Sequence, residues 1–131
     1  MIKIFSKYKF IFYIFNFFLI ILYLFPGSLL GLFLYNDLNS QPQITPDFII
    51  STNHIYTFLI VSTVGFLTYN KSNQFIYISF YLIFLSSALE GAHYFIPERS
   101  FQISDLFGNI IGVIIVIIIF YFFKKNENFK N

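Results

Sequence analysis

The chain has 131 residues, of which 57% are hydrophobic and only 11% are charged, and its formal net charge is +2 at pH 7. A soluble domain carries about 25% charged residues to cover its surface, so much of this chain is expected to face lipid. The small net charge excludes a nucleic-acid footprint. The absence of cysteine excludes disulfides and thiolate sites. We expect one transmembrane domain over residues 1–131.

The first apolar segment predicts a transmembrane helix over residues 8–25, after a basic lead. Pro26-Gly27-Ser28 is typical of a helix break, and a short apolar run over residues 29–35 follows. The helix either continues through Pro26 with a kink or ends there, leaving a short interfacial segment; we favour the break. A signal peptide also begins in this way, but no small-x-small cleavage site follows, so we expect an uncleaved helix.

A second helix is predicted over residues 46–69. Thr45 has the character of an N-cap, Pro46 suits the first helical position, and Asp47 lies near the positive end of the helix dipole. A polar turn at residues 70–73 then separates this helix from the next one.

Two further helices are predicted over residues 74–93 and 104–123. Ser104 is the expected N-cap of the last helix, with Asp105 as the acid of its first turn. Each predicted helix has close to the 20 or so residues that cross about 30 Å of hydrocarbon. The sequence therefore predicts an all-α integral membrane protein, a four-helix bundle.

Basic residues are divided unequally between the two predicted sides of the membrane. One side carries only Arg99, whereas the other carries Lys3, Lys7, Lys9, Lys71, Lys124, Lys125 and Lys130. Lysine-rich flanks stay in the cytoplasm. We therefore predict a multi-pass membrane protein with both termini in the cytoplasm.

Ionisable side chains collect on the opposite, outer side. Glu90 and His93 are three residues apart and share a helix face, and Asp105 and Asn109 do so at a spacing of four. His54 is expected about 12 Å along the second helix, at 1.5 Å per residue, which is a depth similar to that of Glu90 and Asn109. Polar groups in hydrocarbon are costly unless they are paired, so these residues are candidates for a site.

Gly108 and Gly112 form a small-xxx-small pattern on the last helix. This pattern lets two helices approach closely, and we expect these glycines to serve helix packing.

The stretch EGAHYFIPERSFQISDLFGNIIG, residues 90–112, resembles the signature of VanZ-like membrane proteins. That family shows a glutamate, a glutamine three residues later, Pro-x-Arg, an acid near the start of the last helix and Asn-x-x-Gly. An upstream histidine of the family is matched by His54, and the resemblance covers roughly residues 46–120. Two departures are His93, where the family usually has glutamine, and Ile50-Ser51, where it often has Asp-Lys.

The resemblance implies a location in the bacterial inner (cytoplasmic) membrane and a link to glycopeptide (teicoplanin) resistance or envelope homeostasis. From the residues, we expect a protein that binds or handles a phosphate-bearing lipid at the outer leaflet, and the resemblance implies a lipid-linked cell-wall precursor or a glycopeptide as the possible partner. Arg99 offers a bidentate fork to phosphate. Further ligand contacts are expected from His93, Asp105 and Asn109.

Two alternatives are of other classes. In a membrane-embedded enzyme acting on a lipid-linked substrate, Glu90 and His54 are the acid–base pair. A metal-dependent version would use His54, His93, Glu90 and Asp105 as ligands, but no HExxH-like signature is present, so we expect no metal or other cofactor. In a purely structural alternative, the polar residues hold the helices together.

Overall fold

The computed structural model describes residues 2–128, and within that range the chain forms helices and loops without a strand. The side chains of Lys3, Lys7 and Lys130, which contribute to the predicted sidedness, lie outside the described part. The helical elements are α1 (Ile2–Leu24), α2 (Leu29–Tyr35), α3 (Thr52–Thr68), α4 (Ser72–Ala92), the 3-10 turn η1 (His93–Phe95) and α5 (Ile103–Asn128).

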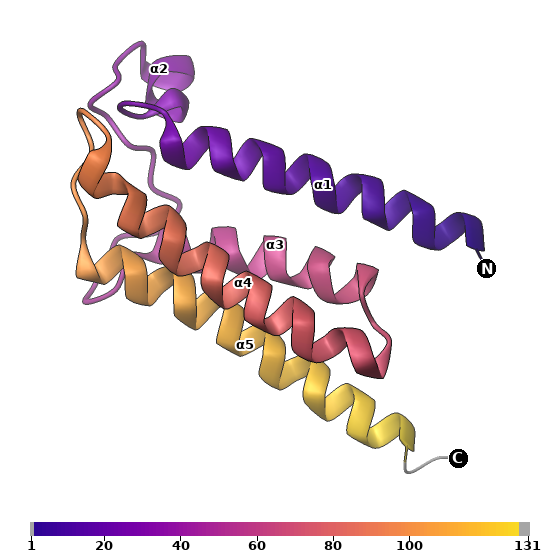
Figure 1. The fold of residues 1–131 in the computed structure, drawn as a ribbon. Coiled ribbons are helices and arrows are strands. Elements are labelled where there is room, and N and C mark those ends of the chain that lie inside the picture. The colour runs from indigo at the N-terminus through magenta and orange to yellow at the C-terminus, as the bar shows by residue number, and fades with distance from the viewer. Residues whose placement is uncertain (1, 129–131) are drawn as a thin grey trace.

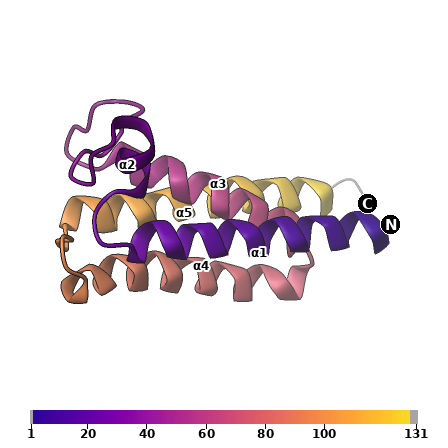
Figure 2. The ribbon, with the colours of Figure 1, turned by 90° about the horizontal axis from the view of Figure 1, so that it is seen from above.

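The four long helices lie side by side, and α2 folds across one end of them (Figures 1 and 2). Helix α5 packs against both α3 and α4, and α1 contacts α3 and α4. The described ends of the chain and the turn between α3 and α4 lie at one end of the molecule. The loop over residues 36–51 and the connector over residues 96–102 lie at the other end, which we call the loop end.

The expected break at Pro26 is confirmed. Helix α1 ends at Leu24, and the axis of α2 is bent from that of α1 by 85°. Ser28 is the N-cap of α2 and stabilises its first turn, because its Oγ accepts a hydrogen bond from the backbone N–H of Gly31 at 2.9 Å. Asn36, with a φ of 54°, ends the short helix in the left-handed conformation.

The predicted start of the second helix at residue 46 is wrong, because α3 begins at Thr52. Thr45 is not its N-cap. The Asp47 carboxylate instead approaches from the preceding loop and accepts the Thr52 N–H at 2.8 Å. The negative charge of Asp47 stabilises the positive N-terminal end of the helix dipole, as expected, but Asp47 lies in the loop before the helix and not in its first turn. His54 therefore lies in the first turn of α3 rather than about 12 Å along it.

The last two helices agree more closely with the prediction. Helix α4 begins two residues before the predicted range of 74–93 and ends one residue before its end. Helix α5 begins at Ile103, since the carbonyl of Gln102 accepts the N–H groups of Asp105 and Leu106. Ser104 therefore lies inside the first turn and is not the N-cap. The helix also continues to Asn128, five residues beyond the predicted end.

Two helical stretches in the described part of the chain are long and apolar enough to cross a membrane, namely Asn73–Phe95 and Ile103–Asn126. The bent pair Tyr8–Leu24 and Leu29–Tyr35 makes a third if it is one broken span. Helix α3 has 17 residues. At 1.5 Å per residue it extends about 25 Å, short of a hydrocarbon core of about 30 Å. The protein is thus all-helical, with two or three candidate membrane spans.

Gly108 and Gly112 bring α5 into direct contact with α3. A Cβ atom built on Gly108 would lie 2.6 Å from the carbonyl oxygen of Ser51, and one on Gly112 would lie 2.7 Å from that of Ile55. These distances leave no room for a methyl group. The close approach places the first two turns of α5 against those of α3, where His54 is located.

We predict that Gly112→Ala lowers the free energy of unfolding by about 1–3 kcal/mol, because α3 must move to admit the methyl group. Thermal unfolding of the purified protein in detergent measures this. Gly91→Ala is the matched control, since a Cβ there meets nothing within 4 Å. Equal stability of the two variants would contradict the close α3–α5 contact.

Candidate functional site

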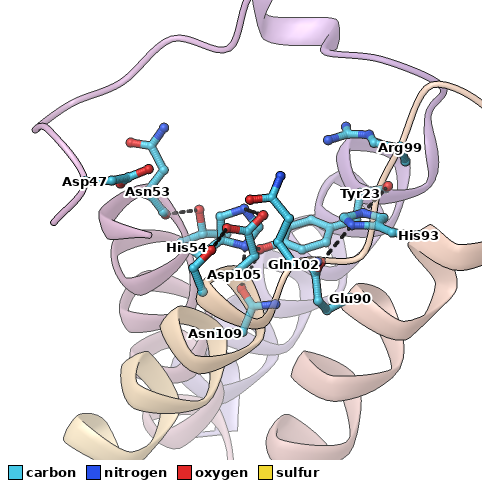
Figure 3. Close-up of polar contacts among 12 residues, drawn as sticks. Tyr23, Asp47, Asn53, His54, Glu90, His93, Arg99, Gln102, Asp105 and Asn109 are labelled. Carbon is cyan, nitrogen blue, oxygen red and sulfur yellow. Dashed lines mark hydrogen bonds and ion pairs between the residues drawn. The ribbon is translucent and has the colours of Figure 1, made fainter. Parts of the chain in front are cut away.

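Six polar side chains meet at the loop end, and Figure 3 shows them pointing toward one another from all four long helices and η1. Glu90 and Asn109 are fully buried, and Asp105 is the most accessible. We call this set the polar cluster; its members are Tyr23, His54, Glu90, His93, Asp105 and Asn109.

The side-chain amide of Asn109 is at the centre of the cluster. Its Nδ2 donates to the backbone carbonyl of Ser86 at 3.1 Å, and a carbonyl only accepts, so the amide orientation is fixed. Its Oδ1 accepts the hydroxyl of Tyr23 at 2.7 Å and lies 2.9 Å from Nδ1 of His54. One residue of α5 thereby contacts α1, α3 and α4.

This geometry assigns the tautomer of His54. Because Oδ1 of Asn109 can only accept, Nδ1 of His54 carries a hydrogen. Its other nitrogen, Nε2, lies 3.5 Å from Oδ2 of Asp105. In the neutral imidazole, Nε2 therefore presents a lone pair toward the Asp105 carboxylate, available to a proton or a cation.

Glu90 and His93 form a second imidazole–carboxylate pair. Nδ1 of His93 lies 3.2 Å from Oε1 of Glu90, and Nε2 lies 3.0 Å from the carbonyl oxygen of Tyr23. Both ring nitrogens face acceptors, and a neutral imidazole can donate to only one of them. Oε1 also accepts the Gln102 N–H at 3.0 Å, whereas Oε2 is buried without a hydrogen-bond partner.

Tyr23 was not predicted from the sequence, although it connects the two imidazole–carboxylate pairs. Its ring stacks on His93 with a centroid distance of 5.8 Å and meets His54 edge-on at 5.3 Å. The available signal was its spacing of seven residues from Asn16, which places two polar groups on one face of an apolar helix. Both residues are buried.

Arg99 lies beside the cluster rather than in it. Its Nε and Nη2 donate to the carbonyl oxygens of Phe25 and Leu22, at 3.1 and 2.8 Å. These carbonyls belong to the C-terminal end of α1, where backbone acceptors lack helical partners. Burial lowers the pKa of Arg99, and the nearby Glu90 opposes this change. The guanidinium remains charged at neutral pH because its reference pKa is so high.

A cavity of about 320 Å³ adjoins the polar cluster. Its apolar lining includes leucines of α1 and α2, such as Leu19, Leu22 and Leu30. Its polar lining includes Tyr23, His54, His93 and Arg99. The two carboxylates of the cluster do not line the cavity; they contact the imidazoles that do.

The structure thus brings the predicted residues His54, Glu90, His93, Asp105 and Asn109 together and places Arg99 next to them. Gly108 and Gly112 lie at the adjacent α3–α5 contact. The direct contacts pair His54 with Asp105 and Glu90 with His93. Tyr23, Ser86 and the backbone of Gln102 are the contributors that sequence reasoning missed.

No family model matches the chain, and neither a curated protein nor a solved structure matches it. The resemblance to VanZ-like proteins stays an expectation from the sequence, based on His54 and the motif at residues 90–112.

We predict that Tyr23→Phe lowers the free energy of unfolding by about 1–3 kcal/mol. Oδ1 of Asn109 loses a buried donor, and Nδ1 of His54 loses its contact with the Tyr23 hydroxyl oxygen, 2.9 Å away. Tyr77→Phe is the matched control, since that side chain is 76% exposed. Thermal unfolding of both variants in the same detergent measures the difference. A Tyr23→Phe protein as stable as the control would show that the hydroxyl does not hold the cluster together.

Proposed function

We propose that this protein is a multi-pass membrane protein, of the type that the VanZ-like resemblance suggests, which binds a phosphate-bearing lipid or cell-wall precursor. The observation that carries this proposal is the cavity at the loop end, whose lining combines leucines of α1 and α2 with Arg99 and two imidazoles. An amphiphilic anion matches this mixed lining. A role in glycopeptide resistance or envelope homeostasis is consistent with such a ligand.

The cavity accommodates part of such a ligand. Ligand sites commonly have volumes of about 300–1,000 Å³, so 320 Å³ suits a headgroup and the first part of an acyl or prenyl chain. The rest of the chain would lie along the exposed apolar surface of α1 and α2, which includes Leu30 and Leu34. Lipid tails are as apolar as leucine, so that surface is compatible with the membrane.

Arg99 supplies the fixed positive charge. Two of its nitrogens are committed to the end of α1, which holds the guanidinium at the cavity wall instead of leaving it as a free fork. A charge held in place loses less conformational entropy when it binds an anion. His54 and His93 line the same cavity beside it.

The proposed topology has four crossings, with α3 as a short one. Lys9, Lys71, Lys124 and Lys125 all belong to the end of the helix assembly away from Arg99. Lysine-rich flanks favour the cytoplasm, which would place both termini there and the polar cluster in the outer leaflet of a bacterial cytoplasmic membrane. A helix shorter than the hydrocarbon thickness is accommodated by local thinning of the bilayer.

A second candidate function is acid–base catalysis on a lipid-linked substrate. The observation that favours it is that each imidazole on the cavity wall contacts a carboxylate, His93 with Glu90 and His54 with Asp105. Carboxylates in this position orient an imidazole and stabilise its protonated form. On this alternative, His54 and His93 face the substrate, and Glu90 acts through His93.

We predict that purified protein binds a polyprenyl phosphate and that Arg99→Gln weakens this binding about 10–100-fold. A charge-assisted hydrogen bond contributes about 1.5–3 kcal/mol, and 1.4 kcal/mol corresponds to a factor of ten. Arg99→Lys, which keeps the charge but not the planar group, gives a smaller loss. Native mass spectrometry of the protein with the polyprenyl phosphate, and with the matching polyprenol, measures phosphate-dependent binding.

Lys71→Gln is the control for this experiment, because it removes the same charge from an exposed position at the opposite end. Unfolding temperatures of all variants are recorded, since Arg99 also caps α1. Equal binding by wild type, Arg99→Gln and Lys71→Gln, or equal binding of the phosphate and the polyprenol, would contradict the proposed function.

We predict that a membrane-impermeant maleimide labels Glu98→Cys in intact cells but labels Asn70→Cys only after lysis. The chain contains no cysteine, so each variant carries a single thiol. Both positions are exposed, in the connector before α5 and in the turn before α4. Labelling of Asn70→Cys in intact cells would reverse the proposed orientation.

A further inference from the structure

We propose that His54, Glu90 and Asp105 form a binding site for a divalent transition-metal ion, with Zn²⁺ as the best match. Each residue offers one ligand atom, and these atoms lie within 4.8 Å of one another. The three residues come from α3, α4 and α5, so folding is required to assemble them. The proposal goes beyond lipid binding, because the ion would bind without a lipid.

His54 is already oriented as a metal ligand. Ligating histidines almost always donate their second ring N–H to a fixed acceptor, which sets the tautomer. Here Nδ1 donates to Oδ1 of Asn109, and Nε2 points its lone pair toward Asp105 at 3.5 Å. Two ligands bound at about 2.1 Å around a tetrahedral ion are about 3.4 Å apart. The observed separation therefore fits an ion between these two ligands. The full set of three lies within 4.8 Å, so Glu90 must shift toward the pair when the ion binds.

Glu90 supplies the second, independent observation. Its side chain is fully buried, and Oε2 has no hydrogen-bond partner. Buried carboxylate oxygens nearly always have a partner, because their lost hydration is otherwise uncompensated. The other oxygen is held by His93 and by the N–H of Gln102. A cation shared with His54 and Asp105 would give Glu90 the partner that it lacks.

The donor set indicates the class of metal. One neutral imidazole and two carboxylates carry a charge of −2, which balances a divalent ion. Imidazole and carboxylate oxygen suit Zn²⁺, and three protein ligands leave a fourth position open for water or a ligand. His93 is not part of the set, since its nitrogens contact Glu90 and the Tyr23 carbonyl. His93 contacts Oε1 of Glu90 and so orients the carboxylate without binding the ion itself.

The ion has a route into the site. The Asp105 side chain is 17% exposed, while the other two ligands are buried. Asp105 belongs to the first turn of α5, next to the connector at the loop end. An ion can therefore bind Asp105 first and then reach His54 and Glu90.

The test is metal binding by the purified, full-length protein in detergent. Metal-free protein is titrated with Co²⁺, whose visible absorption reports tetrahedral binding to protein ligands, and then with Zn²⁺ as a competitor. We expect about one equivalent of Co²⁺ to bind and Zn²⁺ to displace it. Asp105→Asn and Glu90→Gln should each weaken binding by about 100-fold or more, because loss of a mere second-layer partner already costs about 10–100-fold.

Glu98→Gln is the matched control, since Glu98 is an exposed acid at the same end of the molecule. It should bind like wild type. If Glu90→Gln does not fold, the more accessible Asp105→Asn decides. The proposal is overturned if folded wild type gives no Co²⁺ absorption, or if Asp105→Asn binds as tightly as Glu98→Gln. Neither readout involves lipid, so failure here leaves lipid binding through Arg99 to be judged separately.

Discussion

The fold depends on the side-chain amide of Asn109, which is fully buried and joins the four long helices. It belongs to α5, accepts from Tyr23 of α1, approaches His54 of α3 and donates to the Ser86 carbonyl of α4. In an apolar environment, a polar group that finds no partner costs free energy, and water cannot replace the partner. Other directional contacts join the helices in pairs, such as the Tyr81 hydroxyl that donates to Oδ1 of Asn16 at 2.6 Å. The Asn109 amide joins all four and thereby fixes how they meet at the loop end.

The order of the remaining polar contacts follows from that amide. His54 receives its tautomer from Asn109 and so directs its free nitrogen toward Asp105. Tyr23 offers its carbonyl to His93, which in turn contacts Glu90. Glu90 then accepts the N–H of Gln102 and holds the connector before α5. Directional polar contacts thus organise the loop end, whereas the end near the termini is packed by aromatic rings such as Phe66 and Phe120, 5.3 Å apart.

Helix spacing and hydrophobic patterning predicted the helical class and, at the site end, the limits of α1, α4 and α5 to within a few residues. They also predicted every residue of the polar cluster except Tyr23. The pairing of Glu90 with His93 followed from a spacing of three. The start of α3 was predicted wrongly, because Asp47 stabilises that helix from the preceding loop, and no local sequence pattern reveals the path of that loop. The role of Arg99 was also hidden, since its acceptors are the α1 carbonyls, 74 and 77 residues away in sequence. Tertiary contacts of this kind leave no periodic signal.

The positions of the charged groups at the loop end relate the two proposed ligands, the anionic lipid headgroup and the divalent metal ion. The cavity wall carries Arg99 and two imidazoles, and the carboxylates lie away from the cavity. An anionic headgroup in the cavity would therefore meet the positive charge of Arg99 before it met the carboxylates. A cation held by His54, Glu90 and Asp105 would offset both carboxylates and remove their repulsion of that headgroup. Because coupling between two sites is reciprocal, a headgroup that binds more tightly beside the ion also strengthens binding of the ion by the same factor. His54, which belongs to both the cavity wall and the metal set, is the residue through which this coupling would act.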